Sequence, residues 1–163
     1  PGFENARLLE TAAQIGIRET RHIEGLYTVT EDDVIKGRRF EDAIARCAYP
    51  IDIHDPTGSG GHLQGLGSQS GGSPVDLPPD APPYYDIPYR SLVPKNVRNL
   101  LVAGRPISAT HEAAASLRVI PPCYATGQAA GVAAAMSVRT DRQVANIDTI
   151  ELREILTKQG AIV

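Results

Sequence analysis

The chain has no tryptophan, and aromatic residues make up only 5% of its 163 positions. A buried core must therefore be built mainly from Ile, Leu, Val and Ala. The only cysteines, Cys47 and Cys123, are too few for a disulfide scaffold. We interpret them as free thiols in a reducing compartment, and we expect a cytoplasmic protein.

Long apolar runs and dense basic clusters are also absent. Arg, His, Glu or Pro interrupts each apolar run before it reaches the length of a membrane span. The formal net charge is −3, and arginines such as Arg18, Arg21, Arg38 and Arg39 are interleaved with acidic residues. We therefore expect neither a membrane nor a nucleic acid as partner.

The length suits one domain or two small lobes. The first residues, PGFENARLLE, show neither the anatomy of a signal peptide nor an initiator Met. We therefore expect the chain to be the later part of a longer protein. Composition divides it into residues 1–54, a long loop over 55–83 that is rich in Gly, Ser and Pro, and residues 84–163.

Apolar spacing predicts helices and strands on both sides of this loop. Thr30 precedes three acidic residues and makes a good helix start, and Asp148 or Thr149 is expected to cap the last helix. The predicted elements are a helix over 4–14, strands over 17–23 and 26–30, helices over 31–37 and 40–47, strands over 49–54, 84–92 and 100–103, and helices over 121–137 and 149–158.

The most informative segment joins a strand to a helix. The apolar strand predicted over 100–103 is typical of a buried parallel sheet, and it ends at Gly104. Pro121-Pro122 then suits the first turn of a helix. A glycine turn beside a helix N-terminus can hold an anion or a polar ring, here on the amides of Cys123 and Tyr124. Water can equally occupy these amides.

Two glycines lie inside that predicted helix. Gly127 and Gly131 are four residues apart and share one face. Each costs about 1 kcal/mol relative to alanine, so close backbone packing is expected to offset the cost. The packing partner is either another helix of this chain or a segment with glycines of its own, such as a dinucleotide-binding turn.

Four segments form long, ordered motifs: GIRETRHIEGLYTVTEDDV (16–34), YPIDIH (49–54), IPYRSLVPKNVRNLLVAGRPISATHEA (87–113) and SLRVIPPCYATGQAAG (116–131). Together they resemble the C-terminal half of the bacterial FAD-dependent oxidoreductase family. The resemblance implies hydride transfer between a small-molecule substrate and FAD. It also implies an α/β fold, or α+β for the fragment alone, in which 1–54 forms part of a substrate-side lobe and 84–163 completes a Rossmann-like FAD-binding domain.

The sequence departs from that family in one respect. The N-terminal GxGxxG motif is absent, and the nearest candidate, over 58–63, lacks the last glycine. We therefore expect this fragment alone to be inactive and not to bind FAD tightly. Its expected partner is the missing N-terminal FAD-binding half, and the apolar surface left exposed without it predicts self-association.

The resemblance also implies which residues line the flavin ring and ribityl chain: Gly104, Arg105, Ser116, Leu117, Arg118, Val119, Ile120, Pro122 and Cys123. Candidate catalytic residues follow from chemistry. His54 and His111 can relay protons, and Arg90 can clamp a carboxylate. Each of these three also suits a purely structural role.

Two other interpretations stay open. The chain can be a non-catalytic fragment or interaction module. It can also be a small hydrolase in which Cys123 or Ser108 is the nucleophile and His111 the base, although no nucleophile elbow is present. No metal site is expected, because His111-Glu112 lacks the second histidine of a zinc-protease helix.

Overall fold

The computed structural model describes residues 2–54, 61–64 and 84–163, although not the side chains of 54 and 61–64. Its elements are α1 (Glu31–Ile35), β1 (Ala43–Cys47), β2 (Ile51–His54), β3 (Gly61–Gln64), β4 (Tyr85–Pro88), the 3-10 helix η1 (Tyr89–Leu92), α2 (His111–Leu117), α3 (Ile120–Thr140), the 3-10 helix η2 (Val144–Asn146) and α4 (Thr149–Lys158).

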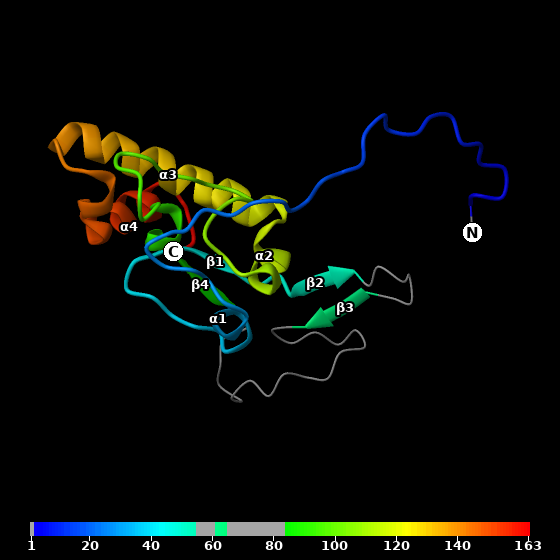
Figure 1. Ribbon diagram of the computed structural model, residues 1–163, viewed down its shortest axis with the longest axis horizontal. Helices are drawn as coiled ribbons and strands as arrows, with labels where there is room; N and C mark the ends of the chain where they lie inside the picture. Colours follow the sequence, from blue (N-terminus) through cyan, green and yellow to red (C-terminus); the bar gives the residue numbers. More distant parts are fainter. Residues whose placement is uncertain (1, 55–60, 65–83) are drawn as a thin grey trace.

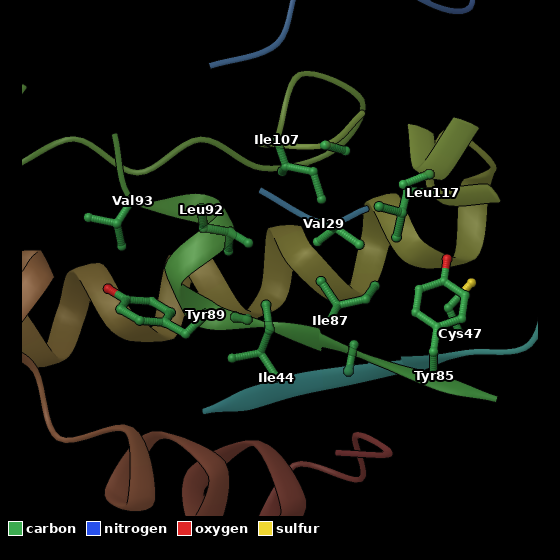
Figure 2. Close-up of a cluster of buried hydrophobic side chains, with 14 of the residues drawn as sticks. Val29, Ile44, Cys47, Tyr85, Ile87, Tyr89, Leu92, Val93, Ile107 and Leu117 are labelled. Atoms are coloured by element: carbon green, nitrogen blue, oxygen red, sulfur yellow. The ribbon is translucent and has the colours of Figure 1, made fainter. Parts of the chain in front are cut away.

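The core is built around one antiparallel strand pair. β1 pairs with β4 in a register that places Ala45 opposite Ile87 and Cys47 opposite Tyr85. The helices α3 and α4 both contact β1 and contact each other (Figure 1). Figure 2 shows core side chains from the two strands and from the segments around them: Ile44, Ile87, Tyr85, Val29, Ile107 and Leu117. The core is thus mainly aliphatic, as the composition predicts, with tyrosines added.

Three predicted helices are confirmed, and local chemistry explains where two of them begin. The Thr30 hydroxyl accepts from the Asp33 amide at 3.3 Å and the Asp33 carboxylate accepts from the Thr30 amide at 2.9 Å, which starts α1 with a capping box. The Asp148 carboxylate caps α4 by accepting from the amides of Ile150 and Glu151. The long helix α3 ends at Asp141, whose backbone is left-handed.

The predicted helix over 40–47 is wrong, because most of that segment is the strand β1. Alanine favours a helix locally, but pairing with β4 and burial between packed elements decide the structure. The predicted helix over 4–14 is wrong as well. Residues 2–22 contain no helix, and Leu8 and Leu9 are exposed. An isolated helix of this length is marginal in water without a surface to pack on.

Three strand predictions are also wrong. Segments 17–23 and 26–30 form no ladder with each other; Gly25 and Val29 instead make isolated bridges to Pro94 and Ala109. Segment 100–103 is not a strand, and its first residue, Leu100, is 42% exposed. The predicted strand over 84–92 is half right, because β4 gives way to the 3-10 helix η1.

The sheets decide the fold class. In the part of the chain that the structure describes, both sheets are two-stranded and antiparallel, formed by β1 with β4 and β2 with β3. The parallel sheet of an α/β fold is therefore not seen there, and the α+β alternative agrees with the structure. The loop predicted over 55–83 lies outside the described residues, apart from β3. No helix among the described residues combines the length and the apolar character needed to cross a membrane.

Candidate functional site

A cavity of about 590 Å³ lies at the N-terminus of α3. Its walls come from segments that are far apart in the sequence, including the N-terminal segment, β2 and the turn after Gly104. The lining residues are Arg18, Tyr49, Asp52, Arg105, Arg118, Val119, Ile120, Pro121, Cys123 and Tyr124. A cavity of this size takes a small organic group.

The start of α3 offers fewer donors than its sequence suggests. Pro121 and Pro122 carry no amide hydrogen, so Ile120 supplies the only N–H of the first three helical residues. The Cys123 amide donates to the Val119 carbonyl at 3.3 Å. The expectation that the Cys123 amide is free is therefore wrong, because this helix already bonds it internally.

The glycine turn is attached directly to α3. Gly104 has a φ of +76°, which a residue with a side chain rarely adopts. Its amide donates to Thr126 Oγ1 at 3.0 Å, and that hydroxyl donates to the Pro122 carbonyl at 2.8 Å. A Cβ atom at position 104 would lie 3.8 Å from Cys123 Sγ. The turn and the first two turns of the helix thus form one continuous wall.

Glu19 is the centre of a charged cluster beside this wall. Its Oε1 accepts from His22 Nε2 at 3.1 Å and from His111 Nδ1 at 3.0 Å. Its Oε2 accepts from Arg118 Nη1 at 3.1 Å. The carboxylate therefore fastens the extended N-terminal segment to both ends of α2.

The environment of Glu19 keeps it ionised. Burial by itself would raise the pKa of this carboxyl, since its side chain is only 15% exposed. The hydrogen bonds that His111 and His22 make to this carboxylate outweigh burial and lower its pKa below the usual value.

Two further arginines stand at the junction of this cavity with a smaller one of about 240 Å³. Arg18 Nη1 lies 3.9 Å from Asp52 Oδ2, and Arg105 Nη1 donates to the Ile17 carbonyl at 2.6 Å. Both side chains line both cavities. The junction therefore carries positive charge within reach of either cavity.

The structure brings together most of the expected flavin-lining residues. Five of them line the larger cavity: Arg105, Arg118, Val119, Ile120 and Cys123. Pro122 lines an adjoining cavity of about 390 Å³. Ser116 and Leu117 instead point into the core, where the Ser116 hydroxyl donates to the Tyr49 carbonyl at 2.6 Å and accepts from the Tyr85 hydroxyl at 2.6 Å.

The three candidate catalytic residues have different surroundings. His111 is in contact with Glu19, as above. Arg90 holds Asp42 through two guanidinium nitrogens, Nε at 2.9 Å and Nη2 at 3.1 Å, and does not line the cavity. The side chain of His54, at the end of β2, lies outside the described residues.

Sequence reasoning missed Glu19 as a functional residue, along with its partner His22. Neither stands out by residue type. Both belong to the GIRETRH motif within 16–34, which carried the family resemblance. The repeated charged positions of that motif were the signal that could have identified them.

The hydrolase interpretation finds no support in the described residues. Burial raises the pKa of the Cys123 thiol, which nearby Arg105 offsets only in part. A thiol in that state is a poor nucleophile. The Ser108 hydroxyl is buried and lies 2.9 Å from Thr28 Oγ1. Among these residues, no group of three or more His, Cys, Asp or Glu side chains could hold a metal ion.

Comparison with known families gives one match. The model of a family described as FAD dependent oxidoreductase matches residues 1–156, and the chain belongs to this family. The family predicted from the sequence motifs is thereby confirmed, and with it an oxidoreductase class in which FAD is the cofactor. The search of curated proteins and the search of solved structures gave no match.

Proposed function

We propose that this chain is the C-terminal portion of a bacterial FAD-dependent oxidoreductase and that the cavity at the N-terminus of α3 holds the flavin ring and ribityl part of its FAD. The observation that carries the proposal is the convergence of the Gly104 turn, Arg118 and the α3 N-terminus on that one cavity. Residues 84–163 complete the FAD-binding domain, and residues 1–54 contribute to the substrate side.

The cavity suits one part of FAD rather than the whole dinucleotide. Its walls combine apolar surface from Val119, Ile120 and Cys123 with the guanidinium groups of Arg105 and Arg118. This mixture fits a planar ring with polar edges and a polyol chain. The sequence has no GxGxxG turn for the pyrophosphate. We therefore place the binding of the pyrophosphate on a further part of the protein, and we expect this portion alone to be inactive.

Each wall has a distinct task in this proposal. When bound, FAD supplies the capacity to exchange a hydride with substrate. Arg105 and Arg118 lie where they can donate to flavin or ribityl oxygens, and the Ile120 amide adds a donor at the positive end of α3. His111 does not itself line the cavity, but it is the best placed of the three candidate catalytic residues, because its ring contacts Glu19, which also holds the cavity residue Arg118. His54 and Arg90 remain weaker candidates.

The outward face of α3 supports the assignment to a larger protein. A Cβ atom added at Gly127 or Gly131 would meet nothing within 4 Å in the described residues. Tyr124 and Val138 on the same helix are 76% and 84% exposed. We propose that this face packs against the rest of the FAD-binding domain, and that without that domain it drives self-association. A monodisperse monomer in sedimentation would contradict the second part.

The test of the function is a substitution at the glycine turn. In the product of the complete natural reading frame, Gly104→Leu should abolish FAD binding, because a branched side chain would strain the backbone and project toward Cys123. The measurement is flavin absorbance per protein after purification. Gly16→Leu is the matched control, since no atom of the described residues lies within 4 Å of a Cβ at that position. Stoichiometric flavin in the Gly104 variant would refute the assigned site, and a colourless natural protein would favour the non-catalytic interpretation.

A further inference from the structure

We propose that Glu19 is a positioning residue that holds the His111 ring with its proton on Nδ1, so that Nε2 is the nitrogen available to exchange a proton with substrate. The use of His111 in the reaction rests on the proposed function above. The effect of Glu19 on the ring does not, because it follows from hydrogen bonding within this chain.

The geometry fixes which His111 nitrogen carries the proton. His111 Nδ1 lies 3.0 Å from Glu19 Oε1. An ionised carboxylate only accepts hydrogen bonds, and the lowered pKa of Glu19 keeps it ionised. Nδ1 must therefore be the donor. A single proton on the ring satisfies this bond and leaves a lone pair on Nε2, and 62% of the side chain is exposed.

His22 has a different requirement, although it contacts the same oxygen. Its Nδ1 lies 2.9 Å from the Ile107 carbonyl and its Nε2 lies 3.1 Å from Glu19 Oε1. Both neighbours are acceptors, so His22 needs protons on both nitrogens to make both bonds. A ring with both nitrogens engaged anchors Glu19, whereas His111 keeps one nitrogen for chemistry.

Arg118 completes the support from the opposite side. Its Nη1 donates to Glu19 Oε2 at 3.1 Å, and its Nη2 donates to the Asp52 carbonyl at 2.7 Å. The side chain is only 10% exposed. Three donors from separate positions thus hold the Glu19 carboxylate in one orientation. This arrangement parallels the orienting carboxylate of hydrolase triads, which sets the tautomer of its histidine without itself taking a proton.

The chemical step that this arrangement supports is one proton transfer. The O–H or N–H bond of a substrate breaks, its electron pair stays on the substrate atom, and the proton forms a bond with His111 Nε2. The ring then carries a positive charge beside Glu19. The titratable and charged groups that face this carboxylate are His22, Arg118 and His111 itself, and Arg18 and Asp52 lie next along the same wall.

The experiment reads the tautomer directly by nitrogen NMR of the chain labelled with ¹⁵N-histidine. His111 signals are assigned by their loss in His111→Gln, and spectra are taken at a pH where titration shows the ring to be neutral. We expect a protonated Nδ1 in the wild type. Glu19→Ala should shift the population to the Nε2–H form, because the acceptor for Nδ1 is gone. Glu19→Gln should do the same, because its single amide oxygen faces Arg118, which can only donate, and its NH2 group then faces Nδ1.

Three controls separate positioning from folding and from function. Glu24→Ala removes another carboxylate, paired with Lys95, and should leave the His111 signals unchanged. Circular dichroism should show that each variant is folded. If Glu19→Ala unfolds, the tautomer in the wild type and in Glu19→Gln still tests whether Glu19 sets the tautomer of His111. An Nε2–H ring in the wild type, or an unchanged ring in folded Glu19→Ala, would overturn the proposal. Loss of flavin binding at Gly104 tests the function separately.

Discussion

The packed body of this chain differs sharply from its exposed side. We define the exposed side as residues 2–16 and the outward face of α3, which carries Tyr124, Gly127, Gly131 and Val138. In the body, residues such as Ile44 and Ile87 are almost completely buried around β1 and β4 (Figure 2). On the exposed side, residues of the same types lie open to solvent. The beginning of the N-terminal segment leads away from the body (Figure 1), and the segment joins the body at Ile17, whose carbonyl accepts from Arg105.

This difference indicates that the body provides the stability of the fold, whereas a binding role for the exposed side is part of the proposal above. Apolar burial is the main source of folding free energy, so the body holds the fold together. The exposed side contributes little apolar burial to folding, and its open apolar surface is the part that the proposed contact with the rest of the FAD-binding domain would cover. Glu19 lies where the two regions meet, since its carboxylate joins the N-terminal segment to α2. Four substitutions test whether this division is real.

The largest change in the free energy of unfolding is expected for a substitution inside the body. Ile87→Ala removes a fully buried side chain from the centre of β4 and should destabilise the chain by about 2–5 kcal/mol, through lost burial and a residual cavity. Urea unfolding followed by circular dichroism measures this change. Val138→Ala, on the exposed side, should change the free energy of unfolding by less than about 0.5 kcal/mol. A similar decrease in the free energy of unfolding in the two variants would contradict the distinction between the body and the exposed side.

A second, smaller effect is expected where the backbone of the body is tightly packed. A Cβ atom at Gly25 would lie 2.7 Å from Ser108 Cβ, a separation that requires backbone or side-chain movement. Gly25→Ala should therefore destabilise by about 1–3 kcal/mol, as overpacking typically does. Gly16→Ala is the control, because its new methyl group has no neighbour within 4 Å in the described part of the chain. Equal stability of both variants would show that the Gly25 contact is loose.

Local signals predicted part of this fold and nonlocal pairing decided the rest. Thr30 and Asp148 predicted helix starts correctly because a capping residue acts on amides next to it in sequence. The segment over 43–47 was mispredicted because its strand depends on β4, beyond a long intervening segment. The segment over 4–14 was mispredicted because its apolar face has no surface to pack on.

The candidate site shows the same contrast. The motif that carries the family resemblance contributes Arg118 and Ile120 to one wall of the cavity, since those residues are contiguous with the α3 N-terminus. That this wall holds flavin stays a prediction. Glu19 could not be predicted as the partner of His111, because that contact joins positions far apart in sequence. Ser116 belongs to the same motif, yet its side chain faces the core, since successive helical residues point in different directions.

At Glu19, where the two regions meet, we expect a smaller contribution to the free energy of unfolding, and this contribution depends on pH. The pKa of Glu19 is lowered in the folded chain, so its stabilising contribution is present above its ordinary pKa near 4.5 and is lost as the pH falls through the folded value. Glu19→Gln should cost about 1 kcal/mol or less at pH 6. The difference from wild type should shrink toward pH 3.

Urea unfolding at several pH values measures this difference. Glu24→Gln is the control, because Glu24 is an exposed partner of Lys95 and should give little difference at any pH. A gap between wild type and Glu19→Gln that stays constant down to pH 3 would show that the ionised carboxylate is not what joins the N-terminal segment to the body.

The smallest expected change in the free energy of unfolding is a stabilisation, and it comes from a substitution on the exposed side. Gly131 is inside α3 with open space around it, so Gly131→Ala should stabilise this chain by about 0.5–1 kcal/mol through helix propensity alone. In the complete natural protein the same methyl group should lower flavin content if a partner segment packs closely on this face. Parallel measurements of unfolding and flavin content separate the two. If Gly131→Ala stabilises this chain and leaves the flavin content of the complete protein unchanged, no segment packs closely on Gly131. That result would contradict a binding role for the exposed side.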